Sequence, residues 1–410
     1  MTSYSTLGES AALDLPILPA GWTYRELGAL LKPKGLSYGI VQPGSEDTGG
    51  VPMLRVKDVR RNRIITDDVL RVSRDVEAKY PRSRLEGGEI LLSLVGSVGE
   101  VAVVPPSLAG WNVARAIAVV RLANQTHSAW LKYYLASNIA QHHMRVWQTT
   151  TVQATLNLRD VLRIPIALPT EGERAAIVAI LDALDGKIAV NDRVVHTCDE
   201  LRTLRLRHWM RSNPELAEER PLSSLASFVN GRAFTKDATG AGRMVVRIAE
   251  INSGPGESTV YNDIKVPDVH LARPGDVLFA WSGSLTVARW FRPEAIINQH
   301  IFKVIPNTGV PVWLAHEFVG AKLAAFKGIA AGKATTMGHI QRRHLDECVL
   351  ASVQSCIPDL DAELGPLWNR ALAAQQESLI LEELRGALLP GLMSGEIRVR
   401  DAEMIVGDMT

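Results

Sequence analysis

The sequence has few cysteines and no long apolar run, and both absences narrow the class of protein. Three cysteines in 410 residues, Cys198, Cys348 and Cys356, are too few for a disulfide framework and favour a reducing compartment. We find no unbroken apolar run of about 18 residues, the length that a membrane-spanning helix needs. The N-terminal sequence also lacks the basic stretch and apolar stretch of a secretory signal peptide. We therefore expect a cytoplasmic protein with no membrane contact.

Sequence motifs of catalysis are absent as well. Neither GxGxxG, a Walker loop, GxSxG nor HExxH occurs. The Pro105–Pro106 pair lacks the amide or acid and the aromatic ring of the Asn/Asp-Pro-Pro-Tyr/Phe motif of DNA amino-methyltransferases. No glycine-rich site for S-adenosylmethionine and no paired-carboxylate nuclease motif stands out. We therefore expect the chain itself to be non-catalytic.

One short cluster resembles a metal site in spacing. His339, His344 and Cys348 follow the pattern H-x4-H-x3-C. Zinc usually takes four ligands, often as two close pairs, and no second pair lies nearby. We predict no metal here.

Charge is nearly balanced. Lysine and arginine number 45 against 44 acids, for a net charge of +1, so bulk charge gives no sign of a nucleic-acid partner. Between Arg55 and Arg84, however, ten basic residues stand against five acids. This strip has two interpretations, a solvated face or a phosphate-contacting surface, and its composition alone favours the solvated face.

The strongest positive signal is an internal repeat of half the chain. The shift between matching segments falls from 192 to about 184 residues, which indicates small insertions between the halves. The matched segments are Arg55–Val59 with Arg247–Ile251, Gly88–Leu92 with Gly275–Phe279, Gly96–Ser97 with Gly283–Ser284, and Thr151–Val161 with Thr335–Leu345.

Each half combines short strands and helices and then ends in a long helical segment. Both long segments carry residues at the alternating four- and three-residue spacing of a coiled-coil seam, with the polar Asn191 inside the first seam. We predict that the two seams pack on each other, and that Pro366 kinks or restarts the second helix. The predicted seam residues are Ile177, Leu181, Leu184, Ile188, Asn191, Val195, Cys198, Leu364, Leu367, Ala371, Ala374, Leu381 and Leu388.

These patterns predict an α+β protein of two similar globular domains separated by two long antiparallel helices, related by a pseudo-twofold repeat. A chain of this length with 46% hydrophobic residues is long enough for such a division. The predicted boundaries are 1–18 for an N-terminal extension, 19–170 for the first domain, 171–213 for the central helix, 214–357 for the second domain, 358–397 for the C-terminal helix and 398–410 for a tail.

Three motifs resemble the specificity (S) subunits of type I restriction-modification systems. Leu18–Trp22 reads LPAGW, similar to the opening LPxGW of that family. Leu168–Ile188 is similar to its central helix, with Glu173 in place of the usual glutamine. Leu384–Ile397 reads LRGALLPGLMSGEI and closely matches its terminal LRxxLLPxLMSGEI signature. The resemblance covers nearly the whole chain.

The resemblance implies a non-catalytic DNA-recognition subunit active in phage defence. In that family each globular target-recognition domain reads one half of a bipartite site in double-stranded DNA, and the helices set the spacing. Two modification subunits dock on the chain and methylate adenine with S-adenosylmethionine, so this chain needs no cofactor of its own. Restriction subunits that translocate and cleave DNA join the complex.

The residues that contact DNA are predicted from their chemistry, because lysine and arginine suit phosphates whereas arginine, asparagine, glutamine, serine and threonine suit base edges. In the first domain we select Arg55, Lys57, Arg60, Arg61, Ser97, Arg115, Thr150 and Gln153. In the second we select Arg247, Ser282, Ser284, Gln299, His300, Lys333, Thr335 and Thr336.

Two other functions stay open at this point. One is a self-contained DNA methyltransferase or nuclease with duplicated recognition domains, which the missing motifs disfavour. The other is a free-standing DNA-binding regulator, which only the family resemblance disfavours.

Overall fold

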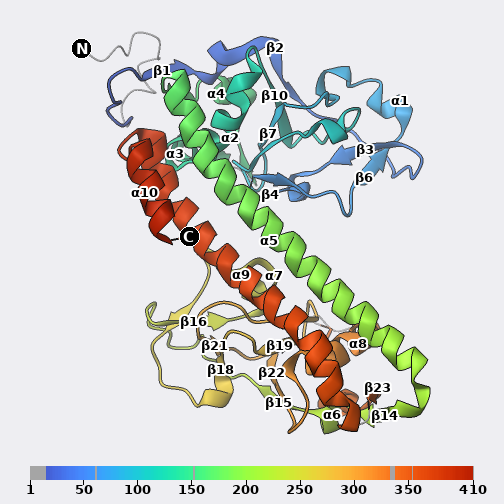
Figure 1. The fold of residues 1–410 in the computed structure, drawn as a ribbon. Coiled ribbons are helices and arrows are strands. Elements are labelled where there is room, and N and C mark those ends of the chain that lie inside the picture. Colours follow the sequence, from blue (N-terminus) through green and yellow to red (C-terminus); the bar gives the residue numbers. More distant parts are fainter. Residues whose placement is uncertain (1–14, 61, 151–152, 333–337, 353, 410) are drawn as a thin grey trace. The chain divides into compact units, whose positions relative to one another are not determined.

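The chain divides into two compact units, each of mixed helix and strand. A computed structural model describes residues 15–60, 62–150, 153–332, 338–352 and 354–409. Unit 1 consists of Met1–Asp185 with Glu383–Thr410, and unit 2 consists of Gly186–Glu382 (Figure 1). Both long helices therefore divide between the units, rather than forming a separate module.

Unit 1 contains two main sheets. The four-stranded antiparallel sheet has the order β2 (Leu31–Tyr38), β10 (Ile117–Leu122), β7 (Ile90–Ser93) and β8 (Val101–Val103). The other has the order β6 (Leu70–Val72), β3 (Val51–Leu54) and β9 (Asn112–Val113), with β3 and β9 parallel. All four residues of β7 are buried, which explains why its sequence is continuously apolar up to Ser93 instead of alternating.

Shorter elements complete unit 1. Its helices and strand pairs are α1 (Arg74–Glu77), α2 (Ser128–Ala136), α3 (Asn138–Val146), α4 (Leu158–Leu162), α10 (Val399–Met409), β1 (Thr23–Glu26) with β13 (Pro165–Leu168), β4 (Val59–Arg60) with β5 (Arg63–Ile64), and β11 (Thr149–Thr150) with β12 (Ala154–Thr155). The segment predicted as a tail thus forms the helix α10 over most of its length.

Unit 2 has the same plan. Its antiparallel sheet has the order β15 (Ala226–Asn230), β22 (Ile301–Pro306), β19 (Val277–Ala280) and β20 (Thr286–Arg289). The second sheet has the order β17 (Tyr261–Asn262), β16 (Arg243–Val246), β21 (Ala295–Ile297) and β18 (Leu271–Ala272). The remaining elements are α6 (Leu222–Leu225), α7 (Ile248–Ser253), α8 (Val312–Ala331) and the pair β14 (Ala217–Pro221) with β23 (Cys348–Ser352).

The repeat predicted from sequence is visible in the strand register. In unit 1 the parallel pair β3/β9 aligns Leu54 with Val113, and in unit 2 the parallel pair β16/β21 aligns Val246 with Ile297. Parallel pairs need a long crossover, so an equivalent parallel strand pair in each unit marks a duplicated topology.

Two long helices continue from one unit into the other. Helix α5 spans Glu171–Ser212, 42 residues, and α9 spans Ile357–Ser394, 38 residues. They run antiparallel (Figure 1), since Asp185 of α5 pairs with Arg385 of α9 in unit 1, and Arg205 pairs with Glu363 in unit 2. The predicted restart at Pro366 does not occur, because α9 is continuous through this exposed residue.

The predicted seam residues mostly face inward. Val195, Cys198 and Leu367 are half-buried, whereas the other ten are buried. Asn191 is fully buried in unit 2, where its Nδ2 donates to Glu377 Oε2 on α9 at 2.9 Å. A single buried asparagine in an apolar seam specifies one pairing register at some cost in stability.

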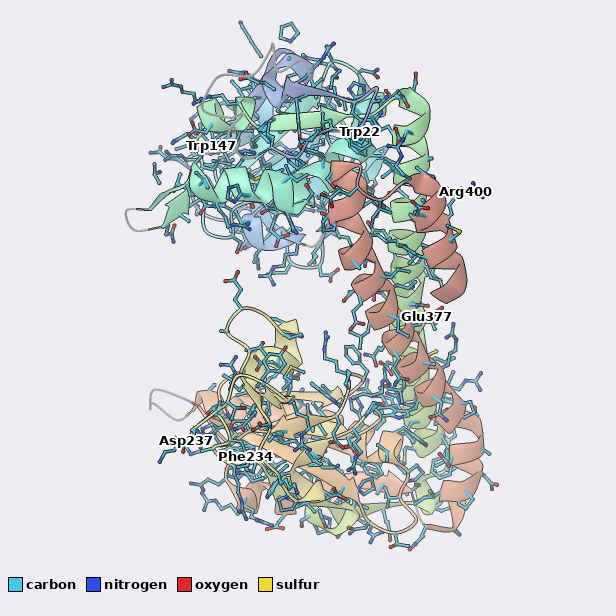
Figure 2. The ribbon with its side chains drawn as sticks, turned by 90° about the vertical axis from the view of Figure 1, so that its left-hand side faces the viewer. Trp22, Trp147, Phe234, Asp237, Glu377 and Arg400 are labelled. Carbon is cyan, nitrogen blue, oxygen red and sulfur yellow. The ribbon has the colours of Figure 1, made fainter. Side chains whose placement is uncertain are left out.

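In unit 1, the segment around Pro19 and Trp22 contacts the segment that follows α9. Gly395, just after α9, has a φ of +79° and lies so close to Pro19 that a Cβ at this position would collide with the proline ring. The indole of Trp22 donates to Glu173 Oε2 at 2.8 Å on α5, and Figure 2 shows Trp22 in the part of unit 1 beside this helix. Arg398 pairs with the same glutamate at 3.3 Å. The LPAGW and MSGEI motifs are thus two sides of one contact.

This contact predicts opposite effects for two glycines of the same segment. Gly395→Ala should destabilise unit 1 by about 1–3 kcal/mol, because the side chain requires an unfavourable φ and collides with Pro19. The matched control is Gly386→Ala inside α9, where a Cβ meets nothing within 4 Å, and this change should be neutral or stabilising by up to about 1 kcal/mol. Urea unfolding of both variants measures the difference, and equal effects would contradict the closure.

Unit 2 buries a group of charged side chains around Trp368 of α9. The guanidinium carbons of Arg289 and Arg202 lie 4.4 and 5.1 Å from the Trp368 ring centroid. The His316 ring of α8 lies 5.3 Å from the same ring, and its Nδ1 is buried without a hydrogen-bond partner. Burial, with the charge of Arg202, lowers the pKa of His316 to about 3.

This histidine predicts an acid sensitivity of unit 2. A folded-state pKa below the ordinary value of 6.5 means that the unfolded chain binds more protons between pH 6.5 and 3. The free energy of unfolding should therefore fall on acidification through this window, by up to about 1.4 kcal/mol per pH unit. His316→Phe should remove much of the slope between pH 6.5 and 5, measured by urea unfolding.

His208→Phe serves as the control, since His208 on α5 is exposed. It should leave the slope as in the unmodified chain. If His316→Phe left the slope of the unfolding free energy against pH unchanged, His316 would not be the source of the acid sensitivity.

Candidate nucleic-acid interface

In unit 1, the parallel strands β3 and β9 end side by side, and polar residues follow both. The Ala114 N–H donates to the Leu54 carbonyl at 2.8 Å, and the Arg115 N–H donates to the Ile40 carbonyl at 2.8 Å. Arg115 is exposed in the turn that leads into β10. These backbone bonds hold the arginine at one sheet edge.

Two further segments of unit 1 meet at the same place. The Leu94 N–H donates to the Ala116 carbonyl at 2.7 Å, and the Leu156 N–H donates to Leu94 at 2.9 Å. The Gly96 N–H donates to the Ala154 carbonyl at 3.1 Å. The Gly96–Ser97 turn, the Arg115 turn and the β11–β12 hairpin with Gln153 therefore form one continuous surface, the unit 1 edge.

Unit 2 repeats this arrangement bond for bond. The Asn298 N–H donates to the Val246 carbonyl at 3.1 Å, and the Gln299 N–H donates to the Arg232 carbonyl at 2.9 Å. The Trp281 N–H donates to the His300 carbonyl at 3.1 Å. Gln299 thus takes the place of Arg115, as the sequence repeat predicts.

The glycine-serine turn of unit 2 also has its counterpart. The Gly283 N–H donates to the Gly338 carbonyl at 2.8 Å, just as Gly96 bonds Ala154. Gly283 has a φ of +64° and Gly96 a φ of +78°, which glycine adopts without strain. We call the surface of Gln299, His300 and the Gly283–Ser284 turn the unit 2 edge.

In each unit the edge is distant from that unit's stretch of the long helices. Trp147 is labelled in Figure 2 at the side of unit 1 remote from α5, close in sequence to the β11–β12 hairpin. Phe234, whose N–H donates to Asn298 Oδ1 at 3.1 Å beside Gln299, is labelled in unit 2 on the side away from that unit's part of α5 and α9.

The structure brings together some predicted DNA-contacting residues and separates others. Ser97, Arg115 and Gln153 are exposed at the unit 1 edge, and Ser284 and Gln299 are exposed at the unit 2 edge. Ser282 is buried beneath its turn. Thr150 lies in β11 by its backbone. The predicted residues Arg61, Lys333, Thr335 and Thr336 lie outside the described residues.

Arg55 and Arg247 lie at equivalent positions of the repeat, and each makes its hydrogen bonds and ion pairs within its own unit. The Arg55 N–H donates to Asp58 Oδ2 at 2.7 Å, and the Arg247 N–H donates to Glu250 Oε2 at 2.9 Å, so each carboxylate caps the short helix that follows. The Arg247 guanidinium also pairs with Glu250 at 2.6 Å. Although burial raises the pKa of Glu250, hydrogen bonds from Arg247 bring it below its ordinary value.

The basic strip between Arg55 and Arg84 is largely engaged within unit 1. Lys57 pairs with Asp68 at 2.6 Å, and Arg84 pairs with the buried Glu77 at 2.6 Å. The Arg84 hydrogen bond lowers the pKa of Glu77. Arg71 and Arg82 donate to backbone carbonyls, whereas Arg60 is exposed on β4. Most of this strip is therefore structural.

His300 is the strained member of the unit 2 edge. Its φ is +71°, which is uncommon for a residue with a side chain, and its Nδ1 is buried without a hydrogen-bond partner. Its ring lies 5.1 Å from that of Trp281, whose indole donates to Asn230 Oδ1 at 2.8 Å. In unit 1 the corresponding positions are Ala116 and Leu94, so the two edges differ in chemistry.

Other arginines near the edges were not selected from the sequence. Arg159 is exposed on α4, directly after the β11–β12 hairpin, and Arg163 lies over the Trp147 ring at 5.7 Å. Arg232 is exposed in unit 2 and bonds Gln299 through its carbonyl. The sequence did carry a signal for Arg159 and Arg163. They lie four residues apart after a Thr/Gln-rich hairpin, with Asp160 between them.

Neither a metal-ligand cluster nor a membrane-spanning helix occurs in the described part of the chain. Within it, no three histidine, cysteine or acidic side chains converge on a metal position. His344 Nδ1 instead accepts from the Gln341 N–H at 3.0 Å. No helix among the described residues has the length and apolar character to cross a membrane.

Comparison with known proteins finds similar sequences for part of the chain. Residues 19–194 match the family described as "Type I restriction modification DNA specificity domain". A relative, the type I restriction enzyme EcoBI specificity subunit of Escherichia coli, is 26% identical over 170 residues. That match covers 41% of this chain and 36% of the relative's length.

A solved structure shares the fold over most of the chain. The type I restriction-modification S subunit from M. genitalium superposes with a TM-score of 0.54 at 14% identity, covering 92% of this chain and 99% of that one. The HsdS subunit from Thermoanaerobacter tengcongensis, at 16% identity, covers 93% and 98% with a TM-score of 0.37. Residues 19–194, somewhat less than half of the chain, are therefore similar to the type I DNA specificity domain, and the fold is shared with the S subunit from M. genitalium.

Proposed function

We propose that this chain is the DNA-specificity subunit of a type I restriction-modification complex, with each unit reading one half of a split target in double-stranded DNA. The observation that carries the proposal is the duplicated edge. The same backbone frame presents Arg115 in unit 1 and Gln299 in unit 2.

Because arginine stands in unit 1 where glutamine stands in unit 2, the two units are suited to reading different half-sites. Arginine forms paired hydrogen bonds with guanine O6 and N7, whereas glutamine does so with adenine N6 and N7. The glycine-serine turns would bring backbone N–H groups near a phosphate, which positions the protein without reading sequence. Two units that each read DNA would explain why the chain is an internal repeat and why it carries no catalytic motif.

Catalysis belongs, in this proposal, to partner subunits in the cytoplasm. Two modification subunits carry S-adenosylmethionine and methylate adenine, so this chain holds no cofactor. Restriction subunits join them for defence against phage DNA. The helices α5 and α9 dock the modification subunits and set the spacing between the half-sites.

An exposed apolar stripe on α5 supports the docking role. Val190, Val194, Thr197, Leu201 and Leu204 follow coiled-coil spacing on unit 2. Val190, Leu201 and Leu204 are 42%, 38% and 53% exposed. A helix of a partner subunit would bury them.

The proposal predicts separable effects on the two half-sites. In complex with the modification subunit, Arg115→Ala should relax base selection at a position of one half-site, and Gln299→Ala at a position of the other, each by about 10- to 100-fold. Methylation sequencing of a random-site library gives the readout. Arg273→Ala, which removes a surface ion pair with Glu294, is the control and should change neither.

Two results would favour the other functions. Either variant relaxing both half-sites alike would refute independent readers. Methyl transfer or cleavage by the purified chain alone would establish the self-contained enzyme, and failure to bind any modification subunit would favour the free-standing regulator.

The docking role predicts a loss of assembly from one surface change. Leu204→Glu should weaken binding of the modification subunit by about tenfold or more, because the charge must be desolvated in the contact. Val269→Glu, an equally apolar and 42% exposed site away from α5, should bind normally. Analytical ultracentrifugation of the mixed subunits distinguishes them, and equal binding would refute docking on the stripe.

A further inference from the structure

One buried arginine of unit 2 ties a strand of the globular part to both long helices. Arg289 is the last residue of β20, and its side chain is 3% exposed. Its guanidinium donates to both carboxylate oxygens of Asp199 on α5 at 3.1 Å each. Its Nε donates to Gln375 Oε1 on α9 at 2.7 Å.

The surrounding side chains make this contact rigid. Arg202 of α5 donates to Asp199 at 2.7 Å and to Glu317 of α8 at 3.0 Å, with its side chain 1% exposed. The Trp368 ring of α9 lies beneath both arginines. Planar guanidinium groups that pair bidentately and stack on an aromatic ring have little freedom to move.

The anchored strand leads directly to the unit 2 edge. Strands β19 and β20 form a hairpin that pairs Val277 with Arg289 at one end and Ala280 with Thr286 at the other. The Gly283–Ser284 turn closes the end opposite Arg289. Four paired residues span roughly 10–13 Å, so the hairpin is a short, stiff connection from helix pair to turn.

The described residues of unit 1 have a different side chain at the position of this anchor. Val103 of β8 occupies the position of Arg289, since it pairs with Ile90 as Arg289 pairs with Val277. Unit 1 instead joins α2 to α5 through Tyr133, whose hydroxyl lies 2.7 Å from Asp182 Oδ1 and 2.8 Å from Asp185 Oδ2. At this position, the ion pair from the strand to α5 is therefore found in unit 2 and not in the described part of unit 1.

We propose, taking the proposed function as given, that Arg289 is a positioning residue that fixes the Gly283–Ser284 turn relative to α5 and α9. It touches no DNA and selects no base. Through the hairpin it makes the second reader intolerant of a wrong spacer length. Loss of the anchor lets the turn shift and accept neighbouring spacings, while the base-contacting side chains keep their chemistry.

The test separates spacing from base selection. Initial methylation rates of the complex with its modification subunit are measured on three duplex types: the cognate split site, sites with one base pair more or less in the spacer, and sites with one base changed in either half. A displacement of about 1 Å can cost a factor of about 100 in rate, so the unmodified complex should discriminate steeply against the wrong spacer. Arg289→Met should reduce that discrimination by about tenfold and leave base discrimination within about twofold.

The matched control is Arg205→Met. Arg205 also joins α5 to α9, through Glu363 at 2.6 Å, but its side chain is 57% exposed and this partner lies on a helix. This variant should keep both kinds of discrimination. Hydrogen exchange adds a DNA-free readout: amides of residues 283–289 should exchange faster in Arg289→Met and remain unchanged in Arg205→Met.

Each outcome bears on one claim. Spacer and base discrimination falling in parallel, or neither changing, would overturn the positioning role, as would unchanged exchange of the hairpin. If Arg289→Met does not fold, Gln375→Leu removes one of the acceptors and should shift spacing tolerance in the same direction. An unmodified complex that methylates no split site would overturn the proposed function itself, whereas the exchange result still decides the anchoring.

Discussion

Each unit depends on the antiparallel contact between α5 and α9, because neither unit is complete without both helices. Unit 1 uses the start of α5 and the end of α9, which meet through Asp185 and Arg385 at 2.5 Å. Unit 2 uses the remaining parts, which meet at the fully buried Asn191 and at Arg205. In unit 2, a single apolar core contains Leu206 of α5, Leu364 of α9 and Phe279 of β19, so the sheet packs against both helices.

The duplicated edges follow from the same duplicated frame. The bonds that place Arg115 and Gln299 are made by backbone groups, so the side chains at these positions are free to differ without disturbing the fold. Packing is also free to diverge, as the replacement of Val103 by Arg289 shows. A common frame with unlike surface residues suits a protein that must recognise two sequences.

The sequence predicted the architecture better than the site. The periodicity of apolar residues identified the long helices, and the repeat offset of about 184 residues made Gln299 the equivalent of Arg115. Long helices and glycine turns carry strong local signals, whereas pairing of charges across loops does not. Arg55, Lys57 and Arg84 therefore read as a basic strip, although Asp58, Asp68 and Glu77 neutralise them in space. Arg289 gave no signal, since its partners lie 90 and 86 residues away.

The contact of Gly395 with Pro19 has a consequence for the order of folding during synthesis. All of unit 2 lies between residues 186 and 382, so it leaves the ribosome before the segment that completes unit 1. Domains usually fold in the order in which they are made. Here the first-made unit finishes last, because the α9 segment that pairs with α5 through Arg385 and Asp185 is made long after the buried, apolar Ile177 and Leu181 of α5. A chain truncated before that segment leaves this apolar surface uncovered and open to aggregation.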